Sequence, residues 1–415
     1  MRDGETRLRL LYLVPYAPTP IRTRPYHLLR EFIRAGHTVT LASLYAEENE
    51  YGALAQWRAA GVETLAAHLS RPRAMTNVLR GAFTTAPLQA AYCWQPALMQ
   101  TVLQALEQST FDAIQVEHLR GAWYGLHIQE FFKKQHWQIP VIWDSVDCIT
   151  HLFEQASRAS TKRASRLMSR VELGRTRAYE KKLARAFART TVVSTRERDA
   201  FCEILEGDCE RVTVVPNGVD VEFFTPPSSP RDAATILFSG KMSYHANVTA
   251  AFYLLDEIMP QVWELMPHAR VEIVGQNPPS VLQRRANERV SVLGYVPDMR
   301  PYLHRATVAC APIRYGAGTQ NKVLEAMACG TAVVATPQAI AALDAQSERD
   351  VLVGTDPANL AAQLVRVLTD GLLRSRLEQR GRQYVEQNHL WQRSANLLTN
   401  VYEQARRDAT RAGRV

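Results

Sequence analysis

Short apolar segments alternate with longer amphipathic ones along nearly the whole chain, and this alternation restricts the fold more than any other feature. The run LRLLYLV at residues 8–14 is almost wholly apolar, which is typical of a parallel strand covered on both faces. A loop rich in Pro and Arg follows at 15–26, then a helical pattern at 27–36 that ends in Gly36, and a second strand at 37–45. This order predicts a right-handed βαβ unit.

The same pattern repeats in two halves of the chain. Strands are expected over FDAIQVEHL, IPVIWDSVD and ARTTVVSTRE in the first half, and over ATILFSG, ARVEIVG, VSVLGYV, ATVACAPI and TAVVATP in the second. Residues 212–231 hold an Asn-Gly turn followed by Pro and Ser, which is typical of a domain boundary, and residues 373–409 are helical throughout. We therefore predict an α/β fold of two tandem doubly wound, Rossmann-like domains facing each other across a cleft.

Length and composition fit such a protein. A chain of 415 residues is too long for one core, and 46% hydrophobic with 22% charged residues is typical of a soluble globular protein. No apolar run approaches the roughly 20 residues that span a bilayer, and the charged N-terminus lacks a signal-peptide core, so we expect a cytoplasmic protein. The cysteines form no CxxC pair, so we expect reduced, buried thiols and no metal site; they are Cys93, Cys148, Cys202, Cys209, Cys310 and Cys329.

Three loops of the second half follow expected strands, where open α/β sheets bind ligands. In the first loop Gly240 lets the backbone turn and Lys241 can reach an anionic group. In the second, Tyr295 and Val296 follow Gly294 and offer backbone groups to the edge of a flat base. Taken alone, each of these two loops also fits an ordinary βα turn.

The third loop, APIRYGAGTQNKVLEAMACG, is more specific because two glycines precede a helix that begins near Thr319. Unpaired amides and the positive end of the helix dipole there suit a diphosphate, while a carboxylate two turns into the helix can accept hydrogen bonds from ribose hydroxyls. The candidate contacts in this loop and helix are Arg314, Gly316, Gly318, Thr319, Lys322 and Glu325.

GTQNKVLEAMACGTAVVAT resembles the donor-binding helix of glycosyltransferase family 4, whose members are retaining enzymes of the GT-B fold. RVTVVPNGVDVEFFTP is similar to the family's interdomain segment, and the other second-half loops follow in the family's order. The likeness is closest to bacterial sugar transferases of exopolysaccharide systems. It implies an acceptor-side domain at 1–215, a nucleotide-sugar donor domain at 216–385, and a C-terminal helix at 386–415 that packs back on the first domain.

The resemblance also implies roles for single residues. Glu325 would bind the nucleotide ribose, Lys241 and Arg314 would face the diphosphate, and the loop around Tyr295 would hold the base. Two departures concern the sugar. Ala317 stands where the family usually has a first glutamate, and HANV stands where a second cation usually follows Lys241. The resemblance therefore extends to the nucleotide and not to the identity of the sugar.

Five residues of the first half are candidates for the sugar and acceptor side. His118 matches the family's histidine that faces the donor sugar, although a lone His at a strand end is as often structural. Asp144 and Asp147 end the next expected strand, where they fit either acceptor contacts or caps of the following helix. Arg22 and Arg24 replace glycines of many relatives and fit either a substrate phosphate or solvated loop charges.

The resulting hypothesis is sugar transfer from a nucleoside-diphosphate sugar to a glycan, lipid-linked or small-molecule hydroxyl. No Asp-x-Asp stands at a strand end, so we expect no metal and no other cofactor. The catalytic candidates are His118, Lys241 and Glu325. Two alternatives stay open: a nucleotide-sugar epimerase or hydrolase on the same fold, and a non-catalytic nucleotide-sugar or nucleic-acid-binding protein. A nicotinamide dehydrogenase is excluded, because the first loop lacks G-x-G-x-x-G.

Residues 158–189 concentrate positive charge. They hold eleven Lys and Arg against Glu172 and Glu180, in a chain whose net charge is +8. Interleaved apolar residues give the segment one partly apolar face, so it fits peripheral association with an anionic membrane at its inner face, and equally a solvated helix. Nucleic acid is not expected, because only Tyr179 and Phe187 among these charges offer rings for stacking.

Overall fold

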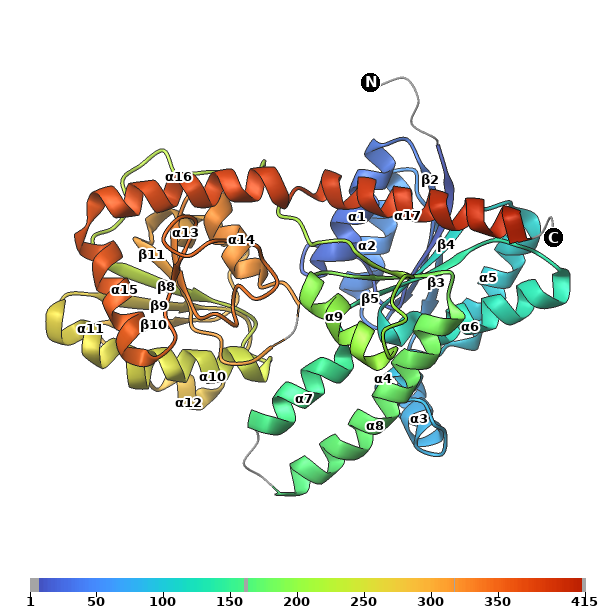
Figure 1. Cartoon of the computed structure of the whole chain (residues 1–415), viewed down its shortest axis with the longest axis horizontal. Coiled ribbons are helices and arrows are strands. Elements are labelled where there is room, and N and C mark those ends of the chain that lie inside the picture. The colour runs from blue at the N-terminus through green and yellow to red at the C-terminus, as the bar shows by residue number, and fades with distance from the viewer. Residues whose placement is uncertain (1–6, 160–162, 317, 413–415) are drawn as a thin grey trace. The chain divides into compact units, whose positions relative to one another are not determined.

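The computed structural model describes residues 7–159, 163–316 and 318–412, and the chain divides into two compact units (Figure 1). The first unit contains the residues up to Pro216 together with those from Ser394 onward, and the second runs from Asn217 to Arg393. The sequence placed these boundaries after residues 215 and 385. Each unit has its own parallel sheet and its own hydrophobic core.

The first unit contains a parallel sheet with the order β3-β2-β1-β4-β5-β6-β7 within the described residues. Its strands are β1 (Arg9–Val14), β2 (Thr38–Tyr45), β3 (Glu63–His68), β4 (Ala113–Glu117), β5 (Val141–Val146), β6 (Arg189–Val192) and β7 (Val212–Val214). The order changes direction at β1, whose neighbours are β2 and β4, so the loops after β1 and β4 diverge there and leave room for a ligand.

Helices connect these strands and pack on the sheet. They are α1 (Thr23–Arg34), α2 (Glu48–Ala59), α3 (Arg71–Ala82), α4 (Leu88–Tyr92), α5 (Pro96–Gln108), α6 (His118–Gln135), α7 (Ile149–Ala159), α8 (Arg163–Ala186), α9 (Thr195–Ile204) and most of α17 (Trp391–Ala412). Two residues of α17 contact the rest of this unit. Arg406 pairs with Asp112, just before β4, and the ring of Tyr402 lies against Phe32 of α1.

The second unit contains a parallel sheet with the order β10-β9-β8-β11-β12-β13 in the part of the chain that the structure describes. Its strands are β8 (Thr235–Ser239), β9 (Arg270–Val274), β10 (Val290–Leu293), β11 (Val308–Ala311), β12 (Ala332–Ala335) and β13 (Leu352–Val353). Its helices are α10 (His245–Tyr253), α11 (Met259–Leu265), α12 (Ser280–Gln283), α13 (Arg300–Arg305), α14 (Asn321–Ala328), α15 (Pro357–Thr369) and α16 (Gly371–Asn388).

Two helical stretches are irregular. The helical stretch that starts with α10 is interrupted by the π-helical turn η1 (Leu254–Ile258), because Pro260 has no N–H to continue the regular bonding pattern. The helix predicted over 373–409 breaks at His389, whose carbonyl accepts a hydrogen bond from Val219 N at 2.7 Å. Leu390 then pairs with Val219 as an isolated parallel bridge.

The cysteine prediction was wrong for one pair. Cys202 and Cys209 form a disulfide across the turn that ends α9, where Gly207 has φ +94°. The turn brings together two sulfurs seven residues apart, a contact that the absence of CxxC does not exclude. The other four cysteines are free and buried, as expected.

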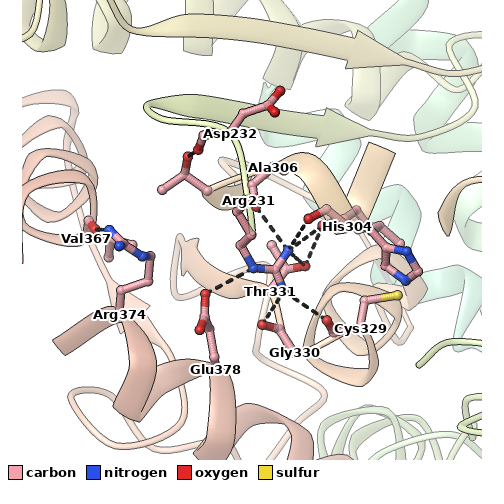
Figure 2. Close-up of polar contacts among 12 residues, drawn as sticks. Arg231, Asp232, His304, Ala306, Cys329, Gly330, Thr331, Val367, Arg374 and Glu378 are labelled. Atoms are coloured by element: carbon pink, nitrogen blue, oxygen red, sulfur yellow. Dashed lines mark hydrogen bonds and ion pairs between the residues drawn. The ribbon is translucent and has the colours of Figure 1, made fainter. Parts of the chain in front are cut away.

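Arg231 fixes the segment that leads into β8 of the second unit (Figure 2). Its two terminal nitrogens donate to the carbonyl oxygens at the C-terminal ends of α13 and α14, among them Leu303 at 2.7 Å and Gly330 at 2.6 Å. Its Nε donates to Glu378 of α16 at 3.1 Å. Because the carbonyls at a helix C-terminus have no partners within the helix, one guanidinium here closes two helix ends and sets the position of α14.

Candidate functional site

The loops after β8 and β11 lie next to each other, because these two strands are neighbours at the point where the strand order of the second unit reverses. The first loop carries Gly240 and Lys241, and the second carries Gly316 and Gly318 and leads into α14. Thus the structure brings together two of the three loops predicted to bind the donor. Tyr295 follows β10, which is an edge strand of the sheet.

The glycine after β8 is required by close backbone packing. A Cβ built on the neighbouring Gly275, which follows β9, would lie 1.8 Å from the carbonyl oxygen of Gly240. A Cβ on Gly240 would lie 2.8 Å from the side-chain nitrogen of Asn247. Only glycine fits at either place, so both loops are held in a single arrangement beside α10.

Asn247 links the first loop to α14. Its side chain is buried, its Nδ2 donates to the carbonyl oxygen of Lys241 at 2.9 Å, and its Oδ1 accepts from Lys322 Nζ at 2.6 Å. The ammonium of Lys322 also lies 5.2 Å from the ring centre of Phe238. Asn247 was not predicted, because the pattern of a helix start does not reveal which side chain faces another loop.

Lys322 and Glu325 lie one turn apart on α14 and are both poorly hydrated. Burial lowers the pKa of Lys322 to about 8, against the opposing effect of the Glu325 charge. Burial raises the pKa of Glu325 to about 7, against the opposing effect of the Lys322 charge. Such shifts mark groups whose charged forms lack solvation, which a polar ligand can supply.

Two polar atoms at the start of α14 have no hydrogen-bond partner within the described residues. Thr319 Oγ1 and Asn321 Oδ1 are both buried and unbonded there. They follow Gly318, whose φ of +68° belongs to the left-handed region that favours glycine. Buried polar groups without partners are rare and costly in native proteins, so these two atoms mark a place where a polar ligand fits.

Three other donor candidates lie in different surroundings. Arg314 is exposed, with its guanidinium 5.0 Å from the ring centre of Tyr253 and 3.9 Å from a carboxylate oxygen of Glu257. The guanidinium of Arg314 therefore lies against side chains of α10 and η1. Tyr295 has an exposed side chain, and Val296 packs against the core of the second unit. Ala317 lies outside the described residues.

In the first unit, His118 stands directly after β4, at the reversal of strand order. Its backbone has φ +61°, which is unusual for a residue other than glycine, and its Nδ1 accepts a hydrogen bond from the backbone N–H of Arg120 at 3.3 Å. Burial, followed by the charges of Arg120 and Arg22, lowers the pKa of His118 to about 3, so its imidazole is neutral. Val146, at the end of the neighbouring β5, has φ +66°. Strained backbone of this kind gathers at functional sites.

A buried carboxyl supports this strand end. Glu117 accepts hydrogen bonds from Tyr12 at 2.5 Å and from Tyr16 at 2.6 Å. Burial, followed by the nearby Asp144 charge, raises the pKa of Glu117 to about 7 although both tyrosines oppose the shift. Arg22 is exposed and lies 4.3 Å above the ring of Tyr16. The sequence missed Tyr16 and Arg120, which accompany the predicted Arg22 and His118.

Arg24 and Asp144 form a buried ion pair rather than an acceptor surface. Arg24 Nε lies 2.8 Å from Asp144 Oδ2, and the two side chains are 5% and 0% exposed. Asp144 also accepts from Thr191 and Gln115, while Arg24 donates to the carbonyl oxygen of Val215. Both predicted acceptor contacts are thus used within the core, because α1 begins at Thr23 and carries Arg24 inward instead of leaving it in the loop.

Asp147 does not supply the hydrogen bonds at the start of α7. The backbone N–H of Ile149 donates to Glu180 at 2.8 Å, and that of Cys148 donates to Glu197 at 2.6 Å. Burial, followed by the Glu197 charge, raises the pKa of Asp147 to about 7. Glu180 of α8 and Glu197 of α9 therefore accept the hydrogen bonds that Asp147 was predicted to accept as a helix cap.

The basic segment 158–189 is described in its second part only, since side chains 156–171 lie outside the described ones. In the described part most cations have acidic or carbonyl partners: Arg175 pairs with Glu172, Arg177 with Glu154, Lys181 and Arg185 with Glu206, and Arg189 with Asp408.

No helix within the described residues is long and apolar enough to cross a bilayer. In the same residues no group of three or more His, Cys, Asp or Glu side chains forms a metal site.

Comparison with solved structures assigns the class of fold. Sucrose-phosphate synthase from Thermosynechococcus elongatus is 17% identical, with a TM-score of 0.67 over 96% of this chain and 99% of that one. Anabaena HepE, solved in complex with UDP and glucose, is 15% identical, with a TM-score of 0.65 over 96% and 100% of the two chains. The two Rossmann-like units are those of the GT-B class.

Comparison of sequences assigns the family. The model described as "Glycosyltransferase Family 4" matches residues 22–223, and the one described as "Glycosyl transferases group 1" matches residues 233–370. The phosphatidyl-myo-inositol mannosyltransferase of Mycobacterium tuberculosis is 32% identical over 46% of this chain and 53% of its own length. The lipopolysaccharide core biosynthesis mannosyltransferase LpcC of Rhizobium leguminosarum bv. viciae is 28% identical over 54% and 67%. The chain belongs to the family 4 glycosyltransferases, and it spans about half the length of the mycobacterial relatives that it matches.

Proposed function

We propose that the chain transfers a hexose from a nucleoside-diphosphate sugar to an acceptor hydroxyl, with retention of configuration and without a metal ion. The observation that carries this proposal is the start of α14, where Thr319 Oγ1 and Asn321 Oδ1 are buried without partners in the described part of the chain, beside the partly desolvated Lys322. A diphosphate and its ribose offer the anionic and hydroxyl groups that such a site lacks.

Donor binding is assigned to residues of the second unit. Lys241 and Lys322, joined through Asn247, contact the diphosphate, and the amides at the start of α14 add the positive end of its dipole. Glu325 accepts hydrogen bonds from the ribose. Arg314 is left out of the diphosphate contacts, because its closest acidic group is Glu257.

The chemistry needs a stabilised leaving group and no protein nucleophile. The bond between the anomeric carbon and the phosphate oxygen breaks, the acceptor oxygen bonds to the same face of that carbon, and the acceptor proton passes to the leaving phosphate. The two lysines offset the charge that develops on the diphosphate. His118, neutral because its pKa is lowered to about 3, serves as a hydrogen-bonding partner for the sugar rather than as an acid.

The acceptor is proposed to be lipid-linked. Several relatives are named as mannosyltransferases of phosphatidylinositol or lipopolysaccharide, and this chain shares up to about a third of their residues in the matched segments. A lipid-linked acceptor requires access to a membrane surface, for which the basic segment 158–189 offers positive charge. Exopolysaccharide or glycolipid synthesis on the cytoplasmic side is the setting that this assignment implies.

Thermal unfolding in a panel of UDP-, GDP- and ADP-sugars tests the donor site, because a ligand that binds the folded state alone raises the melting temperature. Lys241→Ala should weaken binding of the stabilising nucleotide about tenfold to a hundredfold, the loss of one charge-assisted contact. Arg270→Ala is the control, since this exposed cation lies at the start of β9, the other end of the same sheet.

If no nucleotide diphosphate stabilises the protein, the proposed function is wrong. Equal binding by the Lys241→Ala and Arg270→Ala variants would remove the diphosphate role of Lys241. Turnover assays then separate the enzyme classes: transfer needs an acceptor, whereas epimerisation or hydrolysis yields product from the donor alone.

A further inference from the structure

The helix α3 of the first unit has its amphipathic pattern reversed. The residues that it buries are small or polar, Ala74, Asn77 and Gly81, whereas surface helices ordinarily bury their large apolar side chains. The close packing explains the small ones, because a Cβ on Gly81 would lie 2.7 Å from Cβ of Ala91 in α4. The fold therefore has no room on this side of α3 for large residues.

The large apolar residues of α3 and its C-terminal end face outward. Met75 is 58% exposed, Leu79 is 65% exposed and Phe83 is 92% exposed. Their spacing of four residues places them along one face of the helix. Single exposed apolar residues are ordinary, but a row of three bulky ones on one helix marks an interaction surface. We call these three residues the α3 stripe.

Positive charge surrounds the α3 stripe. The helix sequence RPRAMTNVLRGA contains Arg71, Arg73 and Arg80 and no acidic residue. Arg71 is 90% exposed, and its nearest carboxylate, Glu47, is 3.8 Å away. Apolar side chains framed by arginines fit the boundary between the headgroups and acyl chains of an anionic bilayer, where the cations meet lipid phosphates.

The helix is fixed in place rather than formed on binding. Its N-terminus is capped by Ser70, which accepts from the backbone N–H of Arg73, and Asn77 donates to the carbonyl oxygens of Tyr92 and Trp94. At the other end Arg175 of α8 donates to the carbonyl oxygen of Gly81 at 2.7 Å. At Arg175, α8 therefore lies directly beside the C-terminal end of α3 (Figure 1).

We propose that the α3 stripe inserts into the headgroup region of an anionic lipid bilayer, with the exposed arginines of α3 on lipid phosphates. This inference rests on the proposed function in one respect: a lipid-linked acceptor gives the enzyme its reason to be at the bilayer. It assigns the apolar contact to α3, whereas sequence alone pointed to residues 158–189.

Vesicle flotation of the full chain tests the proposal. The protein should float with vesicles of phosphatidylcholine containing about 30% phosphatidylglycerol, and much less with phosphatidylcholine alone. The triple variant Met75→Gln, Leu79→Gln, Phe83→Gln should lower the partition coefficient by at least about a hundredfold, since each side chain loses its apolar transfer. Leu372→Gln, which changes an 87% exposed leucine on α16, is the matched control and should float as the wild type does.

Failure of wild-type flotation on anionic vesicles, or flotation of the triple variant at the wild-type level, would overturn the proposal. So would a lipid-free wild-type dimer that becomes monomeric in the triple variant, since a second copy would then cover the stripe. Nucleotide-induced thermal stabilisation is measured on the same samples. If the triple variant no longer floats but is still stabilised by nucleotide, its defect is confined to the α3 stripe. If nucleotide does not stabilise even the wild type, the proposed donor site is refuted instead.

Discussion

Replacement of Arg231 by Met should destabilise the second unit far more than the loss of an ordinary surface charge. The side chain is 11% exposed, and its guanidinium donates to carbonyl oxygens of α13 and α14, to Thr331 and to Glu378 (Figure 2). Methionine fills much of the same space and donates nothing. The change leaves Glu378 without its cation and two helix ends without their shared donor.

The expected loss follows from these contacts. Removing one member of a largely buried ion pair costs about 3–5 kcal/mol, and hydrogen bonds from a charged donor are worth about 1.5–3 kcal/mol each but do not add. Arg231 borders a pocket of about 870 Å³, through which water can reach some of the freed carbonyls and hold the loss within that range. We expect about 3–5 kcal/mol. Arg231→Lys should rescue little of it, because one ammonium cannot reproduce the fork of bonds.

Differential scanning calorimetry of the full chain measures this effect, with the transition of the second unit identified by its shift in nucleotide. For a unit of this size the loss lowers the transition by roughly 10 °C. Arg374→Met is the control, because Arg374 lines the same pocket but donates to the single carbonyl oxygen of Val367. If the transitions of Arg231→Met and Arg374→Met coincide, the helix-end role of Arg231 is refuted.

Three further outcomes follow from the two units. The pKa of Lys322 is lowered to about 8, so its side chain loses its proton above that pH and must regain it to hold a diphosphate. Nucleotide affinity in calorimetric titrations should therefore fall up to about tenfold per pH unit above 8. The Lys322→Arg variant should show a flatter pH profile. Gly275→Ala should cost about 3 kcal/mol or more in urea unfolding, because its Cβ would clash with a backbone oxygen, whereas Gly294→Ala, with open space around it, should cost under about 0.5 kcal/mol. Asp144→Asn leaves Arg24 charged in the core and should cost about 3–5 kcal/mol, and an unchanged urea midpoint would contradict the buried pair.

Strands with a continuous apolar run were predictable, the edge strand β10 among them, whereas two edge strands without such a run were not. The run 8–14 gave β1, and similar apolar runs gave the central strands of both sheets. The sequence missed β3 and β13. β3 is an edge strand with one buried residue, and β13 has two residues, Leu352 and Val353, so neither carries a long apolar run.

The candidate site divides in the same way. Gly240, Gly316 and Gly318 were predictable, because close backbone packing and left-handed conformations leave few alternatives to glycine. Asn247 was not, since its contact with Lys322 joins residues 75 positions apart. The roles of charged residues such as Arg24 were predicted from their position in a loop or at a strand end. Whether Arg24 is buried depends instead on how α1 packs on the sheet.

The sequence by itself determined two parallel-sheet domains, the loops at their strand ends and the family's donor helix, because hydrophobic periodicity, glycines and helix starts are local properties of the chain. Only the tertiary structure decided which charges are available. It buried Arg24 with Asp144, placed Arg314 beside Glu257, and turned the apolar face of α3 outward. The physical reason is that the state of a charged or apolar side chain depends on its desolvation and on its partners, which come from distant parts of the chain.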